Sequence, residues 1–378
     1  MTVAESTSQV PFFVGIDLHK DSVSMTALRG WSPEPYNEVQ VPNDLTRIGR
    51  FFEGLSKHGP VRACYEASAC GYVLQRALTR KGIECDVIAP SLIPKRRGDR
   101  VKTDRRDARM LARLYRSGDL TPIHVPSAEE EALRELVRCR DTLRQETHRS
   151  KQYVLKLLQR HDLRGPTKKN WTLAFWSWVR RLELPGHSGE VLDQHLVLLD
   201  AKVSQLRDLD ARLEEVWRQD ERLRGPVGRL RCLRGIDTLS ALVLVTEIVD
   251  VRRFARARQL MGWMGLAVSE LSSGEVRRRG GITKAGNSRC RRILIEAAWH
   301  YRHKPATPKA LALRQEGLEP LVVAHARRAQ RRLHKRFRHL DDRKDRCTTV
   351  TAVARELTGF VWALLHDDPA LLVEQPRP

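Results

Sequence analysis

Residues 11–17 read PFFVGID, an apolar run that ends at an acid and predicts a buried β-strand. Residues 22–28 alternate between apolar and polar side chains, which is typical of a strand with one buried face. A third short run at 37–41 is flanked by Pro35 and Pro42. The chain therefore opens with a predicted β-meander.

Helices and further strands follow this meander in alternation. Apolar residues recur at helical intervals in three segments, and two apolar runs between and after them predict buried strands. The predicted helices span 45–58, 71–81 and 103–117, and the predicted strands span 61–65 and 85–89. This order predicts a three-layer α/β domain over residues 10–125.

The middle of the chain, residues 126–224, has a different character. Leucines and valines recur at helical intervals through 128–163 and 191–223, with charged residues between them. Two long amphipathic helices predict an antiparallel hairpin or coiled coil that serves as an arm or a dimer interface. The segment between them carries four aromatic residues, for which packing is favoured over base stacking. They are Trp171, Phe175, Trp176 and Trp178.

Residues 225–370 predict a mainly α domain. Apolar helical patterns occur at 240–248, 293–300, 322–340 and 350–365, and a Gly-rich basic stretch covers 272–292. A turn at Gly235 offers backbone N–H groups to a phosphate, although Asp237 stands where a second small residue would be common.

Charge gives the first indication of a partner. The formal net charge is +22, and residues 251–378 hold 27 Lys and Arg against 12 Asp and Glu. A basic excess of this size favours binding to a polyanion through phosphate contacts and counterion release. We therefore expect a nucleic-acid partner.

The chain contains no apolar run of 18 residues and no secretory signal pattern, so no membrane span or membrane partner is expected. Seven cysteines, an odd number without any Cys-x-x-Cys pair, argue against a zinc site or a disulfide framework. A reducing cytoplasm fits this composition best.

Four acids stand at positions suited to a metal site. Asp17 and Glu66 each end an apolar strand, and Asp104 and Asp107 lie one turn apart on one helix face. Taken singly, Asp17 reads as a strand-end cap and the helical pair as a solvated face. Taken together, the four carboxylates can converge on one point.

Oxygen ligands of this kind are what Mg²⁺ prefers, and Mg²⁺ is the cofactor we expect here. Bound metal ions activate a nucleophile and stabilise the leaving oxygen in phosphoryl transfer. Basic residues directly before the helical pair would attract a nucleic-acid backbone. They are Lys95, Arg96, Arg97, Arg100 and Lys102.

These motifs resemble those of the insertion-sequence-110 family of transposases. The matching segments are GIDLHK at 15–20, YEAS at 65–68 and KTDRRDA at 102–108. The resemblance implies an RNase H-like fold for the N-terminal domain, similar to Holliday-junction resolvases. It also implies that Asp17, Glu66, Asp104 and Asp107 form the metal-binding DEDD tetrad.

The C-terminal third is similar to the transposase domain of the same family, in RARQL at 256–260, GLA at 265–267, SSG at 272–274 and ITKAGN at 282–287. The resemblance implies that a serine before glycine acts as nucleophile. Ser273 matches, and Ser272 beside it leaves a one-residue ambiguity. Basic and polar residues near it would contact nucleic acid: Arg277, Arg278, Arg279, Lys284, Asn287, Arg291 and Arg292.

The activity implied by this resemblance is cutting and rejoining of donor and target DNA through a phosphoserine link. It further implies guidance by a noncoding RNA and assembly as a homodimer or homotetramer. Two other readings remain open at this stage. One is a metal-dependent junction-resolving nuclease with a structural Ser273, and the other is a non-catalytic nucleic-acid-binding protein.

Overall fold

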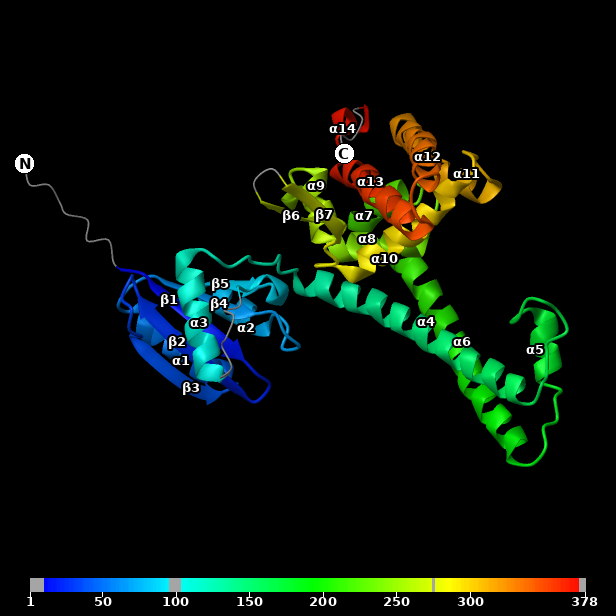
Figure 1. The fold of residues 1–378 in the computed structure, drawn as a ribbon. Helices are drawn as coiled ribbons and strands as arrows, with labels where there is room; N and C mark the ends of the chain where they lie inside the picture. The colour runs from blue at the N-terminus through cyan, green and yellow to red at the C-terminus, as the bar shows by residue number, and fades with distance from the viewer. Residues whose placement is uncertain (1–9, 95–102, 274–275, 374–378) are drawn as a thin grey trace, which may run out of the picture. The chain divides into compact units, whose positions relative to one another are not determined.

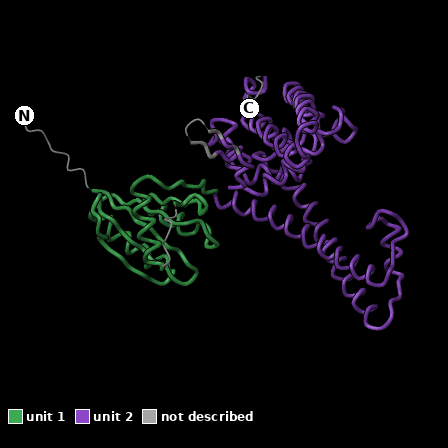
Figure 2. Tube along the Cα trace, viewed as in Figure 1, with its two compact units in different colours: residues 1–126 green, residues 127–378 purple. Residues whose placement is uncertain are grey.

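A computed structural model describes residues 10–94, 103–273 and 276–373, together with most of their side chains. Side chains at 271–273, 276, 277 and 279 lie outside the description. The chain divides into two compact units, Met1–Pro126 and Ser127–Pro378 (Figures 1 and 2).

The first unit is built on a five-stranded sheet of order β3-β2-β1-β4-β5. The central strand β1 is antiparallel to β2 and parallel to β4. On the outer sides, β2 pairs with β3 and β4 pairs with β5. The strands are β1 (Phe12–Leu18), β2 (Ser22–Arg29), β3 (Asn37–Pro42), β4 (Val61–Glu66) and β5 (Glu84–Ile88). The helices are α1 (Leu45–Ser56), α2 (Val73–Arg80) and α3 (Asp104–Ser117).

Helices cover both faces of this sheet. On one face Phe12, Val14 and Ile16 of β1 share a core with Ile48 of α1 and Leu74 of α2. On the other face α3 packs through Leu111 against Cys64 and Ile88 (Figure 1). The alternation of the two cores along each strand is the alternation of side chains across a pleated sheet. The expected three-layer, RNase H-like α/β arrangement is confirmed.

Gly15 sets how closely α3 approaches the sheet. A Cβ at this position would lie 2.1 Å from the Ala108 carbonyl oxygen and 2.3 Å from the Ala112 nitrogen. Both are backbone atoms of α3, which cannot turn aside as a side chain can. The absence of a side chain at Gly15 therefore lets the first turns of α3 lie directly over β1.

The second unit begins with a long helical hairpin, α4 (Ala128–Arg160) packed against α6 (His187–Gln219) (Figure 1). Ser127 starts α4 with a capping box that includes Glu130. Near the far end, α5 (Leu173–Val179) closes a small core. The aromatic residues between the long helices pack there, with Phe175 fully buried and Trp171, Trp176 and Trp178 partly buried.

The rest of this unit surrounds one large apolar core that also receives Val137 of α4 and Leu213 of α6. It is largely helical, as the sequence predicts. The helices are α7 (Glu221–Leu230), α8 (Thr238–Ile248), α9 (Ala257–Trp263), α10 (Ser288–Ala298), α11 (Lys309–Gln315), α12 (Pro320–Asp341), α13 (Arg346–His366) and α14 (Pro369–Val373).

A β-hairpin includes the first part of the Gly-rich basic stretch, for which the sequence analysis named no strand. β6 (Val268–Ser273) pairs antiparallel with β7 (Val276–Ile282), with a register shift between Val268 and Glu270. Glycine, serine and arginine have little intrinsic preference for strands. Backbone hydrogen bonds from Lys284 and Asn287 to Gly265 and Trp263 hold the base of the hairpin, and no local sequence pattern reveals them.

None of the helices in the described part of the chain combines the length and hydropathy needed to cross a membrane.

Candidate active site

The first unit gathers acidic side chains at one end of β1. Asp17 lies on β1 and Asp104 is the first residue of α3, where Thr103 caps the helix by accepting from the Arg106 N–H. His19 Nε2 lies 3.2 Å from Asp17 Oδ2 and 3.7 Å from Asp104 Oδ1. Ligand atoms of all three residues lie within 4.8 Å of one another, a spacing that one metal ion can span.

Asp107 contributes its charge to the same place. Burial is the main influence that raises the pKa of Asp17, and the nearby carboxylates of Asp104 and Asp107 add to it. His19 acts in the opposite direction, yet the pKa of Asp17 stays above its ordinary value. Grouped carboxylates of this kind are costly without a cation. A divalent cation with oxygen preference would remove that cost, so the donor set fits Mg²⁺.

Glu66 is placed beside this group by the sheet register. Ile16 pairs with Tyr65 in the parallel β1–β4 ladder, so Asp17 and Glu66 are the next residues on neighbouring strands. Cys64 contacts Leu111 of α3, and Glu66, two residues on, extends from the same face. Glu66 is solvent-exposed and is not among the three residues whose ligand atoms cluster.

His19 is a site residue that sequence reasoning did not single out. It stands two residues after Asp17, just past the end of β1, in the turn before β2. Its spacing of two residues from Asp17 is the one sequence signal for a shared face, and that signal holds only where the chain stays extended. Its imidazole is more than half exposed, with 56% of the side chain accessible, so it faces the open side of the cluster.

The predicted serine nucleophile lies at the end of β6. Ser273 pairs with Val276 and Ser272 pairs with Arg277 across the hairpin. These positions come from the backbone ladder alone, since their side chains lie outside the description.

The base of this hairpin is fixed by two glycines packed against backbone. A Cβ at Gly265 would lie 2.0 Å from the Ala285 carbonyl oxygen, and one at Gly286 would lie 2.0 Å from that of Trp263. Hydrogen bonds join the same two segments, from Lys284 N to Gly265 O at 3.1 Å and from Asn287 N to Trp263 O at 3.0 Å. The strands therefore leave the helical core at a defined place.

The residues predicted to contact nucleic acid fall into three groups. Arg278 and Lys284 are exposed. Lys102, and the side chains of Arg277 and Arg279, lie outside the described residues. Asn287, Arg291 and Arg292 have partners inside the second unit.

Those internal contacts are specific. Asn287 caps α10 by accepting from the Cys290 N–H at 2.9 Å and donates to Glu247 Oε2 at 2.8 Å. Arg291 donates to the Met264 carbonyl at 2.8 Å, and Arg292 donates to Asp141 at 2.8 Å. In this structure the three side chains connect α10 to its neighbours.

Glu247 is the centre of a buried ionic network that joins α4, α8 and α10. Its side chain is 2% exposed and accepts two hydrogen bonds from Arg138, at 2.7 and 2.8 Å. Burial acts to raise the pKa of Glu247, but hydrogen bonds from Arg138 and Asn287 outweigh it and hold the pKa below its ordinary value. Glu247, 40 positions before Asn287, and Arg138, 109 positions before Glu247, thus help to fix the start of α10.

The turn at Gly235 has a structural explanation. Gly235 has φ of +84°, and a Cβ there would lie 2.6 Å from the Ala297 carbonyl oxygen. Asp237 caps α8 by accepting from the Ser240 N–H at 2.8 Å. A carboxylate therefore already occupies the helix N-terminus that the sequence analysis considered for a phosphate.

Both parts of the chain match known families. Residues 14–162 match the model DEDD_Tnp_IS110, described as "Transposase", and residues 227–312 match "Transposase IS116/IS110/IS902 family". The chain belongs to the IS116/IS110/IS902 family of transposases. The first match includes Asp17, Glu66, Asp104 and Asp107, and the second includes Ser273.

Relatives agree along almost the whole chain. The chain is 39% identical to "Putative transposase y4qE" of Sinorhizobium fredii, over 94% of this chain and 88% of the relative. It is 33% identical to "Transposase for insertion sequence element IS1533" of Leptospira borgpetersenii, over 88% of this chain and 97% of the relative. As a member of this transposase family, the protein is a DNA-processing enzyme of an insertion sequence.

Proposed function

We propose that the protein cuts and rejoins DNA by attack of Ser273 on a phosphodiester, with the acidic residues of the first unit holding Mg²⁺. The observation that carries this proposal is the convergence of Asp17, His19 and Asp104. The charge of Asp107 also acts there, since it helps to raise the pKa of Asp17. Glu66, on the neighbouring strand, is the fourth proposed ligand. Bound Mg²⁺ would supply charge stabilisation at the phosphate and help to activate the nucleophile.

Each step of the reaction forms one P–O bond and breaks another. The Oγ–P bond to Ser273 forms as the P–O bond to one strand end breaks, and the released sugar hydroxyl takes up the serine proton. A second strand's hydroxyl then attacks the phosphoserine, the new P–O bond forms and Ser273 regains its proton. No external energy source is needed, because a phosphodiester is exchanged for a phosphodiester.

The nucleic-acid partners follow from the same scheme. Donor and target DNA are the substrates, and a noncoding RNA of the element is the proposed guide. Arg278 and Lys284 are exposed near the hairpin, where they can neutralise a backbone phosphate. Lys102, Arg277 and Arg279 are proposed contacts on their sequence position, and Asn287, Arg291 and Arg292 support the site by holding α10.

Assembly through the arm is part of the proposal. Large apolar side chains are exposed along α6 and at the tip, including Val197 at 66% and Leu173 at 88% exposure. Burying such side chains in a homodimer or homotetramer removes them from water. Light scattering tests this: Val197→Glu is expected to lower the molar mass of the assembly, whereas an unchanged mass contradicts an α6 interface.

The test of the chemistry is covalent trapping. Full-length protein is incubated with Mg²⁺, element RNA and labelled DNA junctions, then run on a denaturing gel beside Ser273→Ala, Ser272→Ala and Asp17→Asn. The proposal expects an adduct that Ser272→Ala retains and that the other two variants lose. Metal-dependent cleavage that persists in Ser273→Ala would replace the serine reaction by hydrolysis.

A hydrolytic nuclease is the second candidate, favoured by one feature. The acidic cluster is formed entirely by residues of the first unit, so a metal site there needs no residue of the second. Binding of DNA that weakens with salt, with no DNA cutting even when metal and RNA are present, would instead indicate a non-catalytic binding protein.

A further inference from the structure

A basic groove runs between the β6–β7 hairpin and α13 in the second unit. It encloses about 730 Å³, and its charged lining residues are Lys284, Arg336, Lys344, Arg355 and Glu356. In the described part of the chain, Lys284, Lys344 and Arg355 form no ion pair. Glu356 is neutralised by Arg332 and by Arg336, whose Nε lies 3.7 Å away. The groove therefore presents uncompensated positive charge.

Apolar residues line the same groove. Met261, Val268, Ile282 and Ala352 line it, and Gly280 and Gly281 present backbone without side chains. A Cβ at Gly281 would meet no atom within 4 Å, so open space lies over this point of β7. A smaller hollow shares Met261, Val268 and Arg355 with this groove and is also lined by Arg258 and Glu270.

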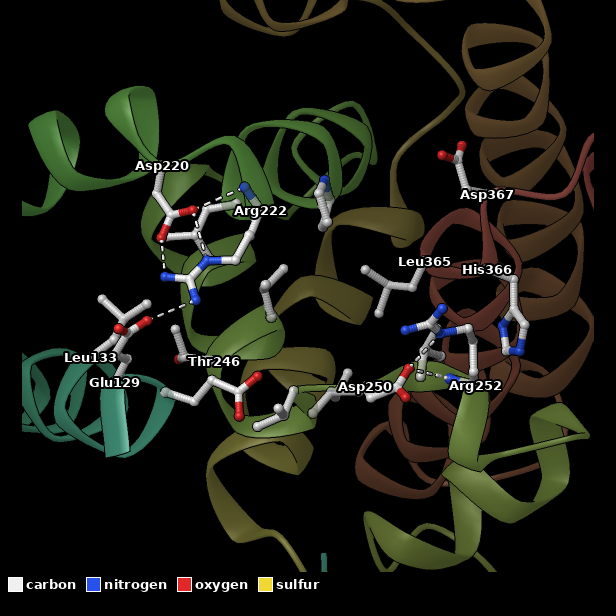
Figure 3. A pocket seen from close by; sticks show the side chains of 17 residues that line it. Glu129, Leu133, Asp220, Arg222, Thr246, Asp250, Arg252, Leu365, His366 and Asp367 are labelled. Atoms are coloured by element: carbon white, nitrogen blue, oxygen red, sulfur yellow. Dashed lines mark hydrogen bonds and ion pairs between the residues drawn. The ribbon is translucent and has the colours of Figure 1, made fainter. Parts of the chain in front are cut away.

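A second cavity of this unit, which encloses about 310 Å³, has the opposite character (Figure 3). It is lined by five carboxylates, and its two guanidinium groups are already paired, Arg222 with Asp220 and Glu129, and Arg252 with Asp250. A polyanion is repelled there and attracted to the basic groove. The difference between two cavities on one unit makes a general charge bias an insufficient explanation.

We propose that this groove, lined by Lys284, Lys344 and Arg355, binds an unpaired segment of a DNA strand, with phosphates at these cationic side chains and bases against its apolar lining. Cationic grooves with apolar surfaces for bases are the usual design for single strands. A cavity of this volume is in the range of small-ligand sites, about 300–1,000 Å³, which is large enough for nucleobases. The inference rests on the proposed function for its choice of DNA.

The location gives the groove a role in the reaction. β7 lines it through Gly280, Gly281 and Ile282, and the same hairpin carries Ser273 at the end of β6. A strand held along β7 is thereby tethered to the element that bears the proposed nucleophile. Binding at remote phosphates can then position the reacting one.

The first test is binding of a fluorescent single-stranded oligonucleotide, measured by anisotropy without Mg²⁺ over a range of salt. Lys344→Gln/Arg355→Gln is expected to weaken binding roughly tenfold and to lower the slope of log K against log salt by about 1.4, two phosphate contacts at 0.7 each. The matched control is Arg212→Gln/Arg252→Gln, which removes the same charge from exposed side chains elsewhere. Equal binding by the two variants overturns the proposal.

A second variant places a charge in the groove instead of removing one. Gly281→Asp adds a carboxylate where the backbone has room for it. It is expected to weaken binding about as much as the double variant, while thermal unfolding stays like that of the native chain. Native affinity in Gly281→Asp contradicts the proposal.

Native thiols localise the bound strand. Cys347 lines the groove and is exposed, whereas Cys139 is exposed on α4 away from it. Saturating single-stranded oligonucleotide is expected to slow alkylation of Cys347 about tenfold, with Cys139 as the unchanged reference, followed by mass spectrometry. Protection by duplex DNA or by RNA strands, but not by single-stranded DNA, overturns the stated ligand.

These results are separable from the proposed chemistry. If Ser273→Ala abolishes the adduct while Cys347 is not protected, the reaction stands and the groove proposal fails. If Cys347 is protected but no adduct forms with native protein, the groove binds DNA and the serine mechanism fails.

Discussion

The acidic cluster and the serine hairpin are built in contrasting ways. The cluster draws Asp17 from a strand and Asp104 from a helix start, and its geometry depends on one close contact, α3 over Gly15. The hairpin is a two-stranded sheet whose place is set at its base, by Gly265, Gly286 and the backbone bonds around them. Both use glycine against backbone, but only the first assembles its charged groups from a strand and the helix that packs on it.

This contrast shows that the two sites can fail independently. A change at Gly15 should disturb metal binding and leave the hairpin intact, and a change at Gly265 should do the reverse. The following predictions use that separation, beginning with the largest expected effect.

Asp17→Asn should abolish the adduct almost completely. It removes the most buried carboxylate of the cluster, and a bound metal contributes several kcal/mol of charge stabilisation. At 1.36 kcal/mol for each factor of ten, a loss of roughly a thousandfold in rate is expected. Adduct yield over time measures it. The control is Asp21→Asn, an exposed acid in the adjoining turn, which should keep the native rate.

Gly265→Ala should destabilise the second unit. The new Cβ meets backbone at 2.0 Å, and φ of +68° is strained for alanine. Overpacking and backbone strain together cost roughly 2–5 kcal/mol. The free energy of unfolding in urea and the yield of the adduct should both fall, while Mg²⁺ binding to the first unit persists. Gly262→Ala, with nothing within 4 Å of its Cβ, is the control, and an equal loss there would contradict the packing argument.

Gly15→Ala should push α3 away from β1. The backbone clash is expected to cost about 1–3 kcal/mol and to weaken Mg²⁺ binding, because Asp104 and Asp107 ride on α3. Calorimetry with Mg²⁺ and thermal unfolding report the two effects. Gly54→Ala on α1 has open space around its Cβ and should be neutral or stabilising. Unchanged Mg²⁺ binding by Gly15→Ala would show that the metal site does not depend on the position of α3.

Glu247→Gln should lower the free energy of unfolding by about 1–2 kcal/mol near neutral pH. The loss is smaller than for a fully buried ion pair because the Arg138 side chain is 41% exposed. The pKa of Glu247 is lowered by folding, so its benefit is present above the usual value near 4.5 and is lost as pH falls through the lowered pKa. The difference in unfolding free energy between native chain and variant should therefore shrink below about pH 4.5. Glu190→Gln, exposed on α6, should show no such trend.

Much of the first unit could be predicted because its signals are local. The run at 11–17 indicates a strand, and the capped helical pattern after Thr103 indicates α3, so Asp17 and Asp104 fall on the right elements. Their convergence requires only that α3 crosses β1. His19 escaped because its role comes from where its imidazole turns, which strand periodicity does not fix.

The second unit was harder to predict for a physical reason. Its site is shaped by contacts between distant segments, such as Arg138 with Glu247 and Arg292 with Asp141. In the sequence, an arginine that forms an internal ion pair cannot be distinguished from one that binds a phosphate. The β6–β7 hairpin was likewise hidden, since its residues favour no strand until Gly265 and Gly286 fix its base.

The most direct test of the account is to map the adduct. Protein trapped on DNA is digested, and mass spectrometry locates the residue that carries the nucleotide, with and without Mg²⁺. The account predicts a nucleotide on Ser273, formed only with the metal and only with Asp17 intact. Cut DNA in the presence of Mg²⁺, with no modified serine in the segment 268–282, would contradict it.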